Sequence, residues 1–163
     1  MRRALVLGLA LVSPGFLMSV RFHSDYVVRA MKARLYFEQD GALGDQELIT
    51  GNPNAVRLWN TIIGAGPAGR PSRVTLVEVQ VVIPGKRVAG ERLRFTARDD
   101  ERTLLAQTVS LEPFFASSDS AWVPFFVFDT GCGGTLTLTA SAIGPKGAVE
   151  STLNRSIDFA CGE

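Results

Sequence analysis

Residues 62–69, with the sequence IIGAGPAG, have the glycine spacing that holds a dinucleotide pyrophosphate in flavoproteins. In such a site a strand, a tight glycine turn and the N-terminus of a following helix meet at the phosphates. Here only residues 70–73 separate the motif from the next expected strand, and Pro71 opposes a helix. Glu78 also comes too early to bind the ribose. The segment is therefore interpreted as a loop between strands, and no cofactor is expected.

Residues 99–101 are three consecutive carboxylates, which could do acid–base or metal chemistry only if they met Asp119 or Asp129 in a cleft. Their place between two expected strands favours a solvated turn. The single histidine, His23, lies in or just after a leader, so neither a Ser–His pair nor a Cys/His zinc site is expected. We therefore expect no catalytic and no metal-ligating residues. A small periplasmic hydrolase or metal-dependent enzyme that uses these loop carboxylates is kept as the alternative function.

Three arginines, Arg92, Arg94 and Arg98, stand on one side of a strand whose other side is apolar. Such a strip could bind a phosphate, a polyanionic glycan or an acidic partner. It could equally be a solvated face that discourages pairing between sheet edges. The three residues are candidate partner-binding residues.

Residues 121–128 are apolar on both faces of the expected strand, which is unusual for a strand with one wet face. Either the N-terminal third of the chain folds over this strand, or its outer face meets a partner. Pro124 favours an edge strand or a bulge, because proline cannot donate to the ladder. The candidate partner-binding residues here are Trp122, Phe125, Phe126 and Phe128.

The elements that position these residues are short strands. Apolar and polar residues alternate over 34–38, 74–83, 92–98, 105–111, 135–142 and 153–159, with glycine- and proline-containing turns between them. Long helical patterns are missing. This pattern predicts an all-β fold, an immunoglobulin-like antiparallel sandwich of seven or eight strands.

The two cysteines, Cys132 and Cys161, permit a sharper prediction. If they face each other across an antiparallel hairpin, the turn falls at residues 144–147, whose sequence GPKG is a good turn. A disulfide there closes a loop of about 30 residues and stabilises the fold by roughly 3–4 kcal/mol. The same register gives three cross-strand pairs: Leu136 with Ile157, Ala140 with Leu153, and the mismatched Leu138 with Arg155.

From Val74 onward the chain resembles bacterial immunoglobulin-like domains of the invasin type. The resemblance is carried by VTLVEV at 74–79, GERLRFTA at 90–97 and GTLTLTA at 134–140, and it extends over about residues 74–160. It implies a sandwich used for adhesion, spacing or binding. The chain departs from the family pattern in having a single copy and a terminal disulfide.

Charge is distributed unevenly along the 163 residues. Six of the 17 basic residues and one acidic residue lie in the first 34 positions, which leaves 11 basic and 15 acidic residues in the remainder. This mildly acidic body argues against nucleic-acid binding. A cationic head at Arg2 and Arg3, followed by an uncharged apolar run over 4–20, predicts a signal peptide. A retained anchor and a true start at Met31 are the alternatives.

The sequence therefore predicts a leader over 1–33 and one sandwich domain over 34–163, with no membrane span after leader removal. The expected function is that of an exported, non-catalytic module with a binding, adhesion or structural role. Its partner would be a protein or glycan at the cell surface, or a second copy of the chain. The expected compartment is the periplasm or the exterior, or the cytoplasm if translation starts at Met31.

Overall fold

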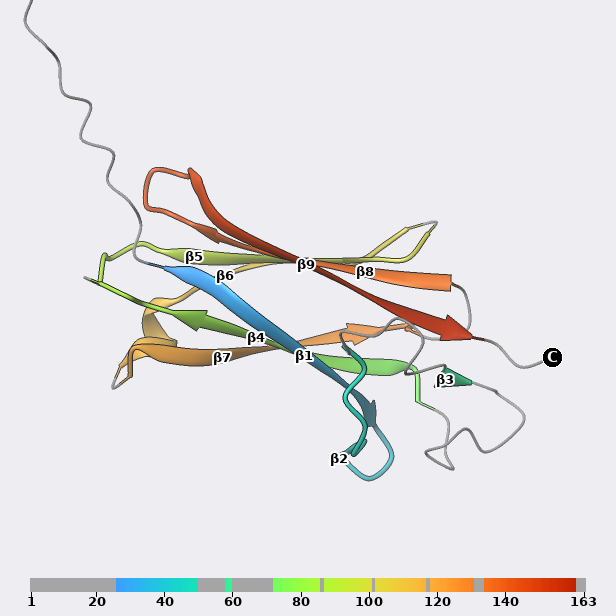
Figure 1. Ribbon diagram of the computed structural model, residues 1–163. Coiled ribbons are helices and arrows are strands. Elements are labelled where there is room, and N and C mark those ends of the chain that lie inside the picture. Colours follow the sequence, from blue (N-terminus) through green and yellow to red (C-terminus); the bar gives the residue numbers. More distant parts are fainter. Residues whose placement is uncertain are drawn as a thin grey trace, which may run out of the picture.

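The computed structural model describes residues 26–49, 58–59, 72–85, 87–100, 102–116, 118–130 and 134–160. These residues form two β-sheets packed face to face (Figure 1). The four-stranded sheet has the order β2 (Ala42–Leu43), β1 (Val27–Phe37), β4 (Val74–Val82), β7 (Ser120–Phe128). The five-stranded sheet has the order β3 (Leu58–Trp59), β9 (Val149–Ala160), β8 (Gly134–Ile143), β5 (Arg92–Arg98), β6 (Thr103–Ser110). A short 3₁₀ helix, η1 (Glu112–Phe115), precedes β7.

The prediction of an all-β, immunoglobulin-like sandwich is confirmed. The seven long strands divide as β1, β4 and β7 in one sheet and β9, β8, β5 and β6 in the other, and all of them pair antiparallel. The two remaining strands are two residues long, and β3 pairs parallel with β9. The predicted number of strands, seven or eight, thus agrees with the seven long strands.

The core lies between the sheets and is built by period-two burial. In β4 and β5 the inward side chains are almost fully buried, as Val77, Val79 and Phe95 show. The rings of Phe95 in one sheet and Phe125 in the other stack with centroids 4.4 Å apart. This pair joins the two sheets across the middle of the core.

The predicted register of the last hairpin is confirmed in the described residues. Leu136 pairs with Ile157, Ala140 with Leu153, and Leu138 with Arg155. The turn forms at Gly144–Gly147, where the Gly147 N–H donates to the Gly144 carbonyl over 2.8 Å and Gly147 has φ +83°. Arg155 is exposed although it lies opposite a buried leucine, so the predicted mismatch costs no buried charge. Cys132 and Cys161 lie outside the described residues.

The predicted boundary at residue 33 is wrong, because β1 crosses it. Residues 26–33 belong to the fold: Tyr26 and Val28 are buried in the core, and Val28 pairs with Val81 of β4. The Tyr26 ring meets that of Phe115 edge-on, with centroids 5.5 Å apart. Burial, with a further contribution from the carboxylate of Glu91, raises the pKa of the Tyr26 hydroxyl.

This correction also limits where a leader can end. Cleavage after Ala30 would remove Tyr26 and Val28 from the core. It would also remove the first residues of β1 that pair with β4. A start at Met31 would do the same. No helix among the described residues is long and apolar enough to cross a membrane, and residues 1–25 of the leader predicted over 1–33 lie outside them.

We expect a chain that starts at Met31 to be less stable than one that starts at Asp25 by about 3–5 kcal/mol, because two buried side chains and their ladder bonds are lost. Chemical denaturation of the two purified chains measures the difference. Equal free energies of unfolding would contradict the place of Tyr26 and Val28 in the core.

Candidate functional site: two faces of the sandwich

Strand β7 lies at the edge of the four-stranded sheet, with β4 on one side. Its odd-numbered side chains, Val123, Phe125 and Val127, are buried between the sheets. Its even-numbered side chains point away from the sandwich, and Phe126 and Phe128 are 42% and 57% exposed. The N-terminal strand β1 lies in the same sheet and does not cover this face.

The prediction that Phe125 is a partner-binding residue is therefore wrong. It is 2% exposed and stacks on Phe95, so it belongs to the core. Both faces of β7 are apolar, so composition alone does not tell whether its odd-numbered or its even-numbered side chains point inward. Trp122, Phe126 and Phe128 do lie on the outer face, as predicted for a contact surface.

Pro124 sits where it removes a donor from the open edge. The Ile83 N–H donates to the Asp119 carbonyl, next to the Val82–Ser120 pair, which makes 83 and 119 a hydrogen-bonded pair of the ladder. Such pairs alternate along an antiparallel ladder, so the Glu78–Pro124 pair is a non-bonded one. The Pro124 nitrogen thus faces away from β4. The edge strand predicted from Pro124 is confirmed, and the proline discourages strand pairing at this edge.

The outer face of this sheet is held by contacts that reach diagonally across β4. The Tyr36 ring on β1 meets the Phe126 ring on β7 edge-on, with centroids 5.1 Å apart. Leu76 of β4 lies directly opposite Phe126, while Tyr36 is opposite Val74, and Leu76 is 8% exposed although it points outward. Further along, the Lys32 ammonium lies 4.7 Å from the centroid of the Trp122 ring.

We call the set formed by Tyr36, Trp122, Pro124, Phe126 and Phe128 the aromatic strip. It is a row of apolar side chains on the outer face of a sheet, partly open to solvent. Contiguous exposed apolar surface of this kind marks contact sites in soluble proteins. The arrangement offers ring faces and edges to a partner, with the Arg34–Glu78 ion pair lying beside Pro124 on the same face.

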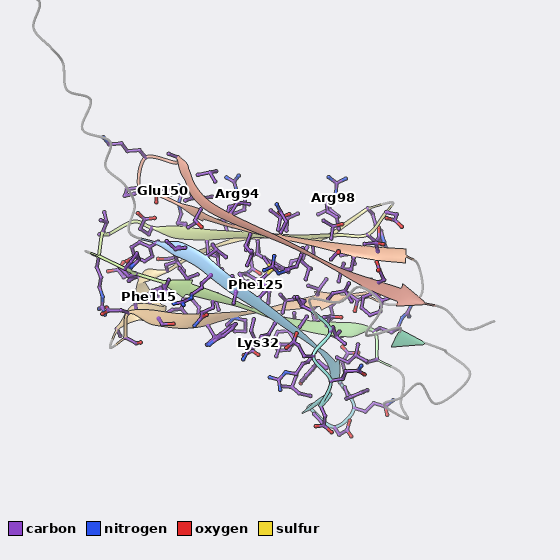
Figure 2. The ribbon with its side chains drawn as sticks, in the orientation of Figure 1. Lys32, Arg94, Arg98, Phe115, Phe125 and Glu150 are labelled. Atoms are coloured by element: carbon purple, nitrogen blue, oxygen red, sulfur yellow. The ribbon has the colours of Figure 1, made fainter. Side chains whose placement is uncertain are left out.

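The three predicted arginines lie on the opposite side of the molecule. Arg92, Arg94 and Arg98 point outward from β5 in the five-stranded sheet, and their inward neighbours are buried. Figure 2 shows Arg94 and Arg98 projecting from the upper layer, away from the layer that carries Lys32. The structure therefore separates the two predicted binding groups onto opposite faces.

Asp119 lies far from the other candidate carboxylates. Asp119 precedes β7 and Asp129 follows it, so a nine-residue strand separates them by about 30 Å. Asp99 and Asp100 follow β5 and lie at its C-terminal end. Asp119 is bound to Arg87 in the β4–β5 connection, which lies at the N-terminal end of β5. The Asp99 carboxylate accepts the Arg102 N–H over 2.7 Å and so closes the β5–β6 turn, as predicted for a solvated hairpin.

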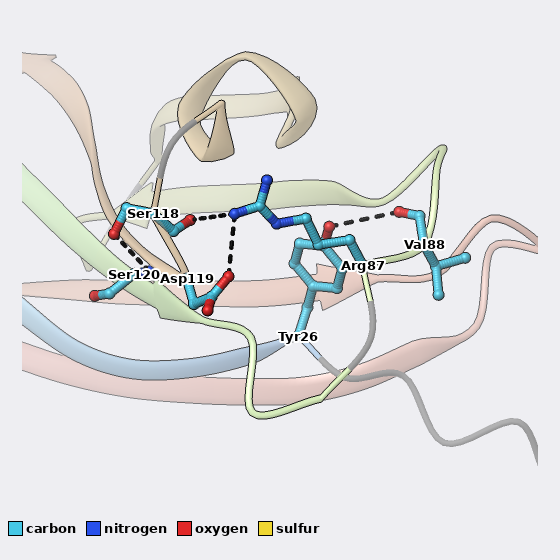
Figure 3. A network of polar contacts seen from close by, with 6 residues as sticks. All are labelled: Tyr26, Arg87, Val88, Ser118, Asp119 and Ser120. Atoms are coloured by element: carbon cyan, nitrogen blue, oxygen red, sulfur yellow. Dashed lines mark hydrogen bonds and ion pairs between the residues drawn. The ribbon is translucent and has the colours of Figure 1, made fainter.

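Asp119 takes part in an exposed polar network that ties the β4–β5 connection to β7 (Figure 3). The Arg87 guanidinium donates to the Asp119 carboxylate over 3.0 Å and to the Ser118 carbonyl over 3.1 Å. The Asp119 side chain is 77% exposed, so the pair contributes little to stability. Its role is to position a loop.

Among the described residues no group of three His, Cys, Asp or Glu side chains could hold a metal ion. Glu101, His23 and residues 62–69 lie outside the described residues. Strand β4 begins at Val74, which leaves residues 70–73 after the glycine motif, and a helix of three turns needs about 11 residues. The interpretation of the motif as a loop stays a prediction.

No family model and no curated protein matches the chain. Among solved structures the chain is similar to the β-glucuronidase of Bifidobacterium dentium complexed with coumarin-3-O-glucuronide, at a TM-score of 0.43 and 12% identity. The match covers 83% of this chain and 18% of that one, so the chain spans less than a fifth of the enzyme's length. A likeness at this level carries no argument about function. The fold and the two faces define the protein as an immunoglobulin-like β-sandwich.

Proposed function

We propose that the protein is an exported, non-catalytic module that binds a partner protein through the aromatic strip. The observation that carries this proposal is the exposure of Phe126 and Phe128 on the outer face of an edge strand. Burying two such rings against a partner removes a large apolar area from water, and aromatic residues commonly supply most of the binding energy of an interface. Pro124 directs the partner to the face of the strand, since it interrupts the open edge.

A non-catalytic role is supported by the distribution of the carboxylates. Asp119 is engaged with Arg87, and Asp99 is engaged with the backbone and side chain of Arg102. An acid–base site needs two such groups aimed at one reacting atom. The Asp119 and Asp99 carboxylates instead bind different loops at opposite ends of the sandwich.

Export is supported by the hairpin that ends the chain. In the described part Gly134 pairs with Phe159, and the sequence predicts that the same register, carried two residues further, would set Cys132 opposite Cys161, both of which lie outside the described residues. Directly paired strand residues have Cα separations that a disulfide can span. Such a bond persists in the periplasm or outside the cell. The apolar run over 4–20 and the resemblance to invasin-type domains agree with this compartment.

The experiment compares the wild-type chain with the double variant Phe126→Ser and Phe128→Ser. Each tagged chain is purified under native conditions from cells that produce it, and its complexes are identified and measured by sedimentation. We expect the wild-type chain to carry a partner protein whose affinity falls at least about 30-fold in the double variant, because the two rings together supply about 2 kcal/mol or more at an interface.

The matched control is Thr108→Ser, a polar exposed position on the opposite sheet. It should keep the partner. Thr108→Ser should unfold at the wild-type denaturant midpoint, and the double variant should remain folded with a loss of about 2 kcal/mol or less, because its two rings are only partly buried. A double variant that folds normally and holds the partner with wild-type affinity would refute the assignment of the strip.

A further inference from the structure

The outer face of β5 carries three cations that nothing in the described structure neutralises. Arg92, Arg94 and Arg98 all point outward, and no ion pair joins any of them to a described residue. Six residues of extended strand place the first and last of them about 20 Å apart. The arginines thus form a column of positive charge along β5, the strand next to the β6 edge of the sheet.

Short polar side chains flank this column on both sides. In the ladder Arg94 lies between Thr108 of β6 and Ser141 of β8. The next row toward β9 is tied together by side-chain hydrogen bonds, 2.8 Å from Thr139 to Asn154 and 2.9 Å between Ser141 and Thr152. We call the three arginines with these flanking residues the arginine face. It combines fixed cations with hydroxyl and amide groups that both donate and accept hydrogen bonds.

The arrangement selects for a ligand with several charges. One exposed arginine–anion contact contributes little, because water competes for both groups. Three contacts made at once by one chain add up, since the second and third form within a single molecule. A linear polyanion that lies along β5 is therefore bound where a single anion is not.

We propose that the arginine face binds an acidic polysaccharide. The choice of a polysaccharide over a nucleic acid rests on the proposed export, because extracellular polyanions are mainly carbohydrates and the charge of the chain would treat either polyanion alike. Hydroxyl side chains beside the arginines match the hydroxyls of sugar rings as well as their anionic groups. The aromatic strip lies on the other sheet, so the two ligands do not compete.

The test measures binding of the full chain to polygalacturonate and to dextran sulfate, with neutral dextran as the uncharged polymer. We expect saturable binding to both acidic polymers that weakens as salt rises, and none to dextran. The triple variant Arg92→Gln, Arg94→Gln, Arg98→Gln should bind at least about 30-fold more weakly, at three- to fivefold for each arginine. Its unfolding midpoint should match that of the wild type.

The control removes three exposed positive charges elsewhere, with Arg29→Gln, Lys146→Gln and Arg155→Gln, and should keep wild-type affinity for both acidic polymers. The Phe126→Ser, Phe128→Ser variant should also keep it, which separates this proposal from that for the aromatic strip. Equal loss in both triple variants would overturn the proposal in favour of net charge alone. Absence of binding to either acidic polymer, or equally tight binding of duplex DNA, would overturn it as well.

Discussion

Replacing Phe125 by alanine is expected to lower the free energy of unfolding by about 3–5 kcal/mol, the range for large aromatic residues truncated in a core. Phe125 is 2% exposed and stacks on Phe95 from the opposite sheet, so its loss leaves a cavity at the contact between the layers. The adjacent change Phe126→Ala should cost about 1 kcal/mol or less, because that ring is 42% exposed and keeps much of its contact with water in the folded state.

Urea denaturation of the two alanine variants and the wild type measures this difference. The variants differ only in which of two neighbouring phenylalanines is shortened, so composition and β-propensity are matched. A large loss for Phe126→Ala with a small one for Phe125→Ala would mean that β7 has the opposite parity. That result would remove the basis of the aromatic strip.

Replacing both Cys132 and Cys161 by serine is expected to lower the free energy of unfolding by about 3–4 kcal/mol, because the disulfide limits the entropy of the unfolded chain. The described register from Gly134–Phe159 inward is the physical reason to expect the bond. Denaturation with and without a reducing agent, together with a count of free thiols in the native protein, gives the measurement.

The reducing agent should destabilise the wild-type protein by that amount and leave the double serine variant unchanged. Two titratable thiols in protein isolated from the oxidising side of a membrane would contradict the bond. The same finding would also weaken the proposal of export, since the pair is one of its supports.

The final hairpin could be predicted to the residue because three local signals agree there. Alternation over 135–142 and 153–159 fixes which side chains face the core, GPKG at 144–147 fixes the turn, and the two cysteines set the register. The observed pairs, Leu136 with Ile157 and Ala140 with Leu153, follow from that agreement.

The start of the domain could not be placed as well. Tyr26 and Val28 stand close after the apolar run over 4–20, and Arg29 and Lys32 continue the basic character of the first residues. A leader and the first half of an amphipathic edge strand share this composition. What distinguishes the strand from a leader is the pairing of β1 with β4. That pairing joins residues far apart in the sequence, so no local sequence pattern reveals it.

The parity of β7 was a similar case. Aromatic residues occupy both faces, so period two does not identify the buried one. Pro124 did not resolve this: its nitrogen must face the open side of an edge strand, which tells which residues lack ladder bonds to β4 but not which face of the strand is buried. The ring contact between Tyr36 and Phe126 carries no sequence signal, since the residues are 90 positions apart.

Two surfaces with different chemistry therefore lie on opposite sheets of one small domain. The aromatic strip on β7 is suited to an apolar protein surface, and the arginine face on β5 is suited to a polyanion. A module of this kind would hold a protein against an acidic polymer, with the sandwich core as a rigid spacer between them.

The most direct test of the aromatic strip places a photo-crosslinkable phenylalanine analogue at single positions in the full chain, in cells that produce the protein. The account predicts crosslinks to a partner protein from positions 126 and 128, and none from position 108 on the other sheet. No crosslink from 126 or 128, or equal crosslinking from 108, would contradict the claim that β7 presents the binding surface.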